Sequence, residues 1–141
     1  MYRKILVALE NGRADSTLLP HVEALAKLAH SELLLIHVAD GWVARNFNHL
    51  KLAESEEMKA DRDYLEKTAL SLRQGGLEVS THLALGDPPR EIIKAAEREH
   101  CDLIAMTTHG HRFIGDIIFG STIHEVRHGT SVPVLLVRAE K

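Results

Sequence analysis

A glycine-bearing loop with basic neighbours is the segment of this chain best suited to binding an anion. An apolar run ends near Met106, Gly110 follows, and Gly120-Ser121 stands in front of a helical continuation. Backbone N–H groups in such a loop, with a hydroxyl at the start of a helix, can bind phosphate. His111 and Arg112 would add positive charge. Turn formation alone is the competing interpretation, because glycine pairs are common between a strand and a helix.

A second candidate is the segment His124-Glu125-Val126-Arg127-His128, which matches the zinc pattern H-E-x-x-H. On a helix this spacing places two imidazoles on one face and a glutamate beside them. The chain has 10 histidines, so a chance match is easy, and the pattern has no third ligand in context. We expect the end of a helix here and no metal site, since imidazoles interact favourably with the helix dipole at that end.

Two further residues with reactive side chains are predicted to pack in the protein and not to take part in catalysis. His37 lies inside an apolar run and is expected to be a packed residue with one hydrogen-bonded nitrogen, and Cys101 a partly buried thiol. The sequence contains neither a Gly-x-Ser-x-Gly elbow nor a complete Walker loop. Efficient turnover is therefore not expected, and any hydrolysis of a bound nucleotide would be weak.

Composition excludes several classes of protein. The chain has 141 residues, 45% of them hydrophobic and 26% charged, which fits a single domain spanning residues 1–141. A net charge of −3 and 4% aromatic residues argue against nucleic-acid binding. We expect no membrane span and no secretory signal, because no apolar run approaches 18 residues. One cysteine allows no intrachain disulfide, so the cytoplasm is the expected location.

Apolar runs alternate with helical patterns along the whole chain. That order predicts an α/β fold: a three-layer sandwich around a five-stranded, mostly parallel sheet. Asp15 or Ser16 is available as the N-cap of the first helix, and Pro88 and Pro89 would open the third. The expected strands are Ile5 to Leu9, Leu33 to Val38, Leu77 to Leu83, Leu103 to Met106 and Val132 to Val137. The expected helices are Ala14 to Ala29, Leu52 to Leu72, one from Asp87 through Ala96, and Asp116 to His128.

Parallel sheets bind ligands beyond the carboxyl ends of their strands, where the strand order reverses on either side of the first strand. In this chain that rule selects four segments, Leu9 to Arg13, Val38 to Trp42, Gly86 to Pro88 and Thr107 to Ser121.

The chain resembles the universal stress protein family over nearly its whole length. That family carries the nucleotide-binding pattern G-x2-G-x9-G-[ST], whose positions here are Thr107, Gly110, Gly120 and Ser121, so three of four match. The segments ILVALENG, LLLIHVAD, GDPPREII, CDLIAMTTHG and SVPVLLV add to the resemblance.

The resemblance implies a Rossmann-like fold of the adenine-nucleotide alpha-hydrolase type and an ATP site, with or without Mg²⁺. It implies that Glu10 holds the ribose. It also implies a cytoplasmic homodimer with a sensing or regulatory role in stress response. The implied binding residues are Ala8, Leu9 and Val38 around the adenine, Met106 and Thr107 along the nucleoside, and Gly110, His111, Arg112, Gly120, Ser121 and Thr122 at the phosphates.

Two residues depart from the family pattern. Glu10 stands where aspartate is commoner, and Thr107 replaces the first glycine, adding a branched β-carbon where the ligand should approach. The alternative interpretation is an interaction module of the same fold whose pocket Thr107 and Glu10 have closed. A third is weak ATPase or phosphotransferase activity.

The final apolar run, Val132 to Arg138, is expected at an edge of the sheet. An uncovered apolar edge invites pairing with its own copy, so the sequence predicts a homodimer through this strand. An edge covered by the same chain is the alternative.

Overall fold

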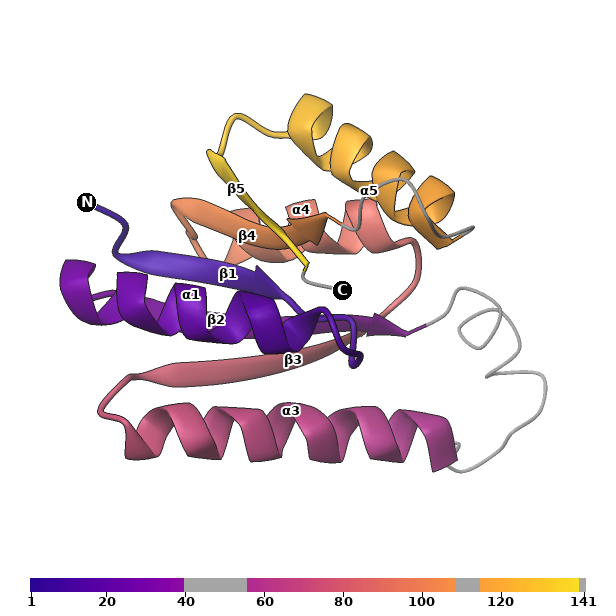
Figure 1. Ribbon diagram of the computed structural model, residues 1–141. Coiled ribbons are helices and arrows are strands. Elements are labelled where there is room, and N and C mark those ends of the chain that lie inside the picture. Colours follow the sequence, from indigo (N-terminus) through magenta and orange to yellow (C-terminus); the bar gives the residue numbers. More distant parts are fainter. Residues whose placement is uncertain (40–55, 109–114, 140–141) are drawn as a thin grey trace.

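A parallel five-stranded sheet, in the order β3-β2-β1-β4-β5, forms the centre of the molecule (Figure 1). The computed structural model describes residues 1–39, 56–108 and 115–139, and for residue 57 and residues 115–121 the backbone alone. In chain order the elements are β1 (Lys4–Ala8), α1 (Asp15–Ala29), β2 (Glu32–Ala39), α3 (Glu56–Gln74), β3 (Val79–Leu85), α4 (Pro88–Arg98), β4 (Leu103–Thr108), α5 (Gly115–Gly129) and β5 (Val134–Arg138).

Both faces of the sheet are covered, which explains why the strands are apolar at successive positions. In β1, Ile5 and Val7 pack with α1 and α3, whereas Leu6 points to the opposite face and packs with α4 and α5. All three side chains are fully buried. Figure 1 shows the same division, with α1 and α3 on one face and α4 and α5 on the other. The expected three-layer α/β sandwich is confirmed.

The first helix forms as its spacing predicts, but it begins differently. Leu18, Val22 and Ala26 are fully buried on one stripe of α1. Ala14 is the N-cap and makes no side-chain capping bond, so the expectation of Asp15 or Ser16 at that position is wrong. Asp15 is the first helical residue, and its buried carboxylate turns back to the preceding loop.

Several strand boundaries differ from those expected, each by one or two residues. Leu77 is buried but precedes β3, which begins at Val79, and β5 begins at Val134 rather than Val132. A buried position favours an apolar residue whether or not that residue pairs in the sheet, so the apolar runs place the starts of these two strands two residues too early. The expectation that Gly120-Ser121 stands before a helix is also wrong, because α5 begins at Gly115 and both residues lie inside it.

None of the helices in the described ranges is suited to a lipid bilayer. The longest is α3, with 19 residues, and charged side chains recur throughout it. No helix of the described part of the chain combines the length and the apolar character needed to cross a membrane.

Candidate functional site

The carboxyl ends of β1, β2 and β4 lie side by side and form the candidate site, here called the carboxyl edge. It comprises residues 8–11, 37–39 and 106–108. β1 pairs with β2 on one side and with β4 on the other, with Ala8 opposite Ile36 and Val7 opposite Ala105. The chain runs outward from β1 through β2 to β3, then continues on the other side with β4 and β5. The strand order therefore reverses at the place where the sequence predicts a ligand.

Glu10 and Thr107, the two departures from the family pattern, contact each other at this edge. Thr107 donates a hydrogen bond from Oγ1 to Oε2 of Glu10 over 2.7 Å. The side chain of Thr107 is buried at 5% exposure, and Glu10 is half-buried. A buried hydroxyl gains most from a charged acceptor, so this bond fixes the orientation of the Glu10 carboxylate.

The backbone of the loop after β1 is held by Asp15. Its Oδ1 accepts a hydrogen bond from the N–H of Glu10 and its Oδ2 one from the N–H of Asn11, each over 2.9 Å. Asn11 adopts φ 60°, a left-handed conformation that asparagine tolerates better than most residues. With 2% exposure, Asp15 stabilises the loop from inside the protein.

Tyr64 of α3 supplies a third donor to Asp15. Its hydroxyl lies 2.6 Å from Oδ2 of Asp15. Burial, together with the hydrogen bond and charge of Asp15, raises the pKa of Tyr64 well above its ordinary value, so the phenol stays protonated and keeps donating. The loop that carries Glu10 is thereby tied to a helix about fifty residues further along the chain.

His37 and Asp61 form a second tie to the same loop. Nδ1 of His37 lies 2.9 Å from the carbonyl oxygen of Leu9, and Nε2 lies 3.4 Å from Oδ2 of Asp61. Asn11 donates from Nδ2 to the other oxygen of Asp61 over 2.6 Å. Both ring nitrogens of His37 face protein oxygens, so neither nitrogen is directed at a substrate. The expected packed histidine with a hydrogen-bonded nitrogen is confirmed.

The other residues of the predicted site are placed as follows. Leu9 and Met106 are buried at the carboxyl edge, and Ala8 and Val38 are half-buried there. Thr122 is buried in α5. The backbones of Gly120 and Ser121 belong to α5, while Gly110, His111 and Arg112 lie outside the described residues.

The paired histidines of α5 and the single cysteine form no catalytic arrangement with other described residues. His124 and His128 are exposed on α5, with ring centroids 4.4 Å apart. In the ranges 1–39, 56–108 and 115–139 no three His, Cys, Asp or Glu side chains could hold a metal ion together. Burial raises the pKa of Cys101 to about 11, so its thiol is not activated and packs in the core as expected.

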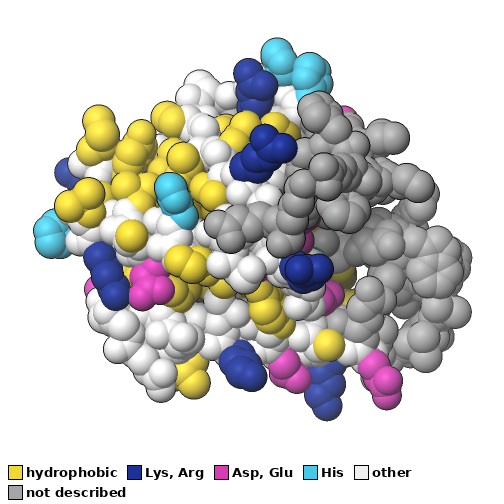
Figure 2. Space-filling view, viewed as in Figure 1, with side chains coloured by type: hydrophobic (Ala, Val, Ile, Leu, Met, Phe, Trp, Pro, Cys, Tyr) yellow, Lys and Arg dark blue, Asp and Glu magenta, His cyan; other side chains and the backbone are white. Residues whose placement is uncertain are grey.

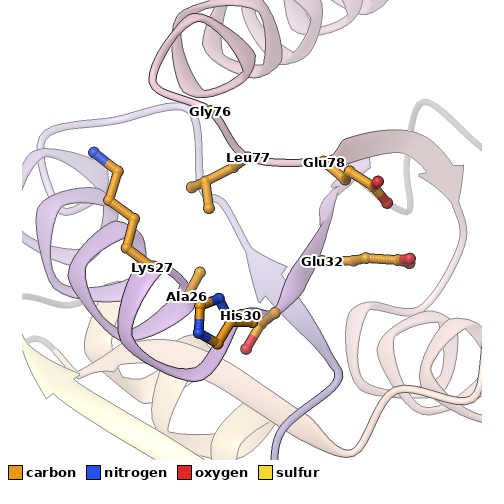
Figure 3. A pocket seen from close by; sticks show the side chains of 8 residues that line it. Ala26, Lys27, His30, Glu32, Gly76, Leu77 and Glu78 are labelled. Atoms are coloured by element: carbon orange, nitrogen blue, oxygen red, sulfur yellow. The ribbon is translucent and has the colours of Figure 1, made fainter.

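A hollow of about 450 Å³ lies at the opposite ends of the strands, between the end of α1 and the starts of β2 and β3 (Figure 3). Ala26 and Leu77 line it together with charged or polar side chains. Glu32 and Glu78 extend to the side opposite Lys27, so the charges do not converge on one point. Volume is the only property that favours this hollow as a site.

Sequence reasoning missed the residues that hold the loop after β1. Asp61 and Tyr64 are three residues apart and therefore lie on one face of α3. That spacing is the one available signal, and it is weak because most of α3 is charged or polar. The sequence predicts Asp15 only as a candidate helix cap, because nothing in its spacing indicates a bond to the preceding loop.

Comparison with known proteins identifies relatives that match nearly the whole chain. A model of the universal stress protein family matches residues 1–138. Universal stress protein MJ0577 of Methanocaldococcus jannaschii is 30% identical, and the alignment covers 98% of this chain and 96% of the relative. Universal stress protein YxiE of Bacillus subtilis is 26% identical, with coverage of 98% and 100%.

Solved structures share the fold. The structure of MJ0577 covers 100% of this chain and 99% of its own, with a TM-score of 0.82 and 30% identity. A universal stress protein of Archaeoglobus fulgidus in complex with dAMP has a TM-score of 0.69 at 20% identity, covering 96% and 98% of the two chains. A universal stress protein in complex with cAMP has a TM-score of 0.71 at 14% identity, covering 99% and 98%.

Proposed function

Because this chain belongs to the universal stress protein family, we propose that it binds an adenine nucleotide, ATP above all, at the carboxyl edge. The fixed carboxylate of Glu10 carries the proposal, since Thr107 holds its side chain and Asp15 holds its backbone. A carboxylate accepts up to about four hydrogen bonds, enough for the hydroxyls of a ribose as well. Proteins of the same fold in complex with dAMP and cAMP support an adenine nucleoside as the ligand.

The proposed adenine pocket is apolar. Ala8, Val38 and Met106 pack on the face of the sheet that α4 and α5 cover, where the half-buried Ala8 and Val38 offer the surface that a base would cover. Leu9 is buried on the opposite face and would border the base through its backbone only. Burial of a flat ring against such side chains supplies affinity, while the ribose and phosphate contacts supply orientation.

The proposed phosphate side is the connection from β4 to α5. It leaves the carboxyl edge at Thr108 and enters the helix at Gly115. We place Gly110, His111 and Arg112 near the phosphates, with or without Mg²⁺, together with Gly120, Ser121 and Thr122 of α5. The N–H groups available within the start of α5 belong to residues 115–117, because the amide of the fourth helical residue already bonds back to the residue before the helix, as Leu18 does to Ala14 in α1.

A homodimer through the segment Val132 to Arg138 is part of the proposal. β5 occupies an edge of the sheet, and Leu136 is 37% exposed on it. Figure 2 shows hydrophobic side chains gathered at upper left, where Figure 1 places the start of β5. Pairing with a second copy would cover that edge. The proposed dimer is cytoplasmic and has a sensing or regulatory role in stress response.

Sensing rather than efficient catalysis is proposed because His37, the histidine of β2 at this edge, directs both ring nitrogens at protein acceptors. A general base needs a nitrogen or oxygen within reach of the proton that it removes. Weak hydrolysis of ATP is the most activity that we propose.

One observation favours a second candidate function. Thr107 is buried and bonded to Glu10, which is also the arrangement expected of a pocket closed by these two residues. In that case the protein would be an interaction module that acts through its partners and its dimer edge.

Release of bound nucleotide separates the two candidates. The purified protein is denatured, the supernatant is analysed by chromatography, and the empty protein is then titrated with Mg-ATP in a thermal-shift assay. We expect released adenine nucleotide or a rise in Tm with ligand, since a concentration of about 100 times the Kd stabilises a protein by about 2.7 kcal/mol. No nucleotide and no shift at millimolar Mg-ATP would overturn nucleotide binding and leave the interaction module.

A further inference from the structure

We propose that the hydroxyl of Thr107 positions the Glu10 carboxylate for ribose hydroxyls, and so sets the preference of the site for nucleotides that carry them. This inference rests on the proposed function and deepens it. Thr107 is a positioning residue in this account, because its hydroxyl acts on the ligand through Glu10.

The geometry assigns Thr107 to this task. β1 and β4 pair in register from Ile5 with Leu103 to Val7 with Ala105. Thr107 lies two residues beyond Ala105 and still pairs with β5, so its backbone is fixed by the sheet. Its side chain is 5% exposed and donates over 2.7 Å to Oε2 of Glu10. A rigid, buried donor therefore orients a half-buried carboxylate.

The lengths of the two side chains match each other. Aspartate at position 10 would be one methylene shorter and would withdraw the carboxylate from the Thr107 hydroxyl. Glycine at position 107 would offer no donor. The two departures from the family pattern thus form one hydrogen-bonded unit, and threonine at this position contributes a contact as well as bulk.

Loss of the hydroxyl alone tests the inference. Thr107→Val keeps the branched shape preferred in a strand and removes the donor, and Thr107→Ser keeps the donor. Kd values for ATP and for 2′,3′-dideoxy-ATP, which lacks both ribose hydroxyls, are measured by calorimetry. We expect Thr107→Val to weaken ATP binding about tenfold while the affinity for the dideoxy analogue changes less than twofold. We expect Thr107→Ser to retain the wild-type preference.

The chain provides a matched control. Thr81 of β3 also donates to a glutamate, with its Oγ1 2.6 Å from Oε1 of Glu66, but on the exposed surface. Thr81→Val removes a bond of the same type outside the site. It should leave the ratio of the two Kd values unchanged, and the Tm of each variant checks that the fold is retained.

The same substitution made in a Glu10→Ala variant shows whether Thr107 acts through Glu10. In Glu10→Ala, Thr107→Val should change the Kd for ATP less than twofold, because no carboxylate is left to orient. A further loss there would mean direct contact with the ribose and would overturn the inference.

The inference and the proposed function fail differently. An unchanged ratio in Thr107→Val, with wild-type ATP binding intact, would overturn the positioning role and leave nucleotide binding standing. Absence of ATP binding by the wild-type protein would overturn both.

Discussion

Polar side chains are held differently at the carboxyl ends of the strands and at their amino ends. At the carboxyl edge Thr107 is buried, and so are Asp15 and Asp61, which hold this edge from α1 and α3; all three bond to residues that are distant in sequence. At the opposite ends of the strands, here called the amino edge (residues 26–32 and 76–78 around the hollow of Figure 3), Ser31 is also buried and donates to the carbonyl oxygen of Tyr2. The charged side chains there are not buried: Lys27 is 51% exposed and pairs with Glu23, only four residues away. The difference is that, among the described residues of these two places, carboxylates are buried and held in place only at the first, which is why we propose the carboxyl edge, and not the hollow, as the binding site.

The largest effect is expected from removing the buried charge of Asp15, which holds the loop of the carboxyl edge from α1. Asp15→Asn keeps the shape, but the amide cannot accept all three hydrogen bonds that reach Asp15 from Glu10, Asn11 and Tyr64. We expect the free energy of unfolding in urea to fall by about 3 kcal/mol. Asp63→Asn, on the exposed surface of α3, is the matched control and should stay within about 0.5 kcal/mol of wild type. Equal effects would remove the contrast between buried and exposed carboxylates.

The next effect concerns the ligand. Glu10→Ala should weaken binding of Mg-ATP about 10- to 100-fold by calorimetry, since hydrogen bonds to a charged group contribute about 1.5–3 kcal/mol. Glu32→Ala makes the same change at the amino edge, where Glu32 is exposed. It should change the Kd less than twofold. Two variants with the same affinity would mean that the nucleotide does not use the carboxyl edge.

A smaller effect is expected at Tyr64, where stability becomes dependent on pH. Tyr64→Phe removes one donor to Asp15 and should cost about 1 kcal/mol at pH 7. The pKa of Tyr64 is higher in the folded chain than in the unfolded chain. Its contribution is therefore complete below the unfolded pKa of about 10 and is lost as the pH rises above it.

Urea titrations between pH 8 and pH 11.5 check this. Wild type should lose stability above about pH 10 more steeply than Tyr64→Phe does, and Tyr2→Phe should behave like wild type. Parallel curves for wild type and Tyr64→Phe would show that the phenol of Tyr64 does not support the loop.

The smallest effect is expected in the hollow itself. Glu78→Gln removes one charge there, from an exposed side chain. We expect stability to change by less than about 0.5 kcal/mol, measured in urea. A loss as large as that of Asp15→Asn would show that the amino edge is organised as firmly as the carboxyl edge.

The fold was predictable because its causes are local and periodic. Runs of successive apolar residues, such as Leu33 to Val38, indicate strands covered on both faces, and Pro88 begins α4 as expected. Strand ends were less predictable. Leu77 is buried without being in a strand, and nothing in an apolar run separates these two cases.

The sequence predicts where a site should lie, and that stays a prediction, but it does not predict the hydrogen bonds found there. The reversal of strand order about β1 and the family pattern select Glu10 and Thr107 independently of any coordinates. Their hydrogen bond joins residues 97 positions apart, and that of Asn11 with Asp61 spans 50. No spacing rule predicts contacts over such separations. The sequence alone therefore predicts that Thr107 hinders the approach of the ligand, whereas the structure shows that it donates a hydrogen bond to Glu10.

An amide chemical-shift titration with Mg-ATP tests the central claim, nucleotide binding at the carboxyl edge, most directly. The amides of Leu9, Glu10 and Thr107 should shift with one common saturation curve, while those of His30 and Glu78 in the hollow stay unchanged. Saturable shifts confined to the hollow, or no shifts at several millimolar Mg-ATP, would contradict it.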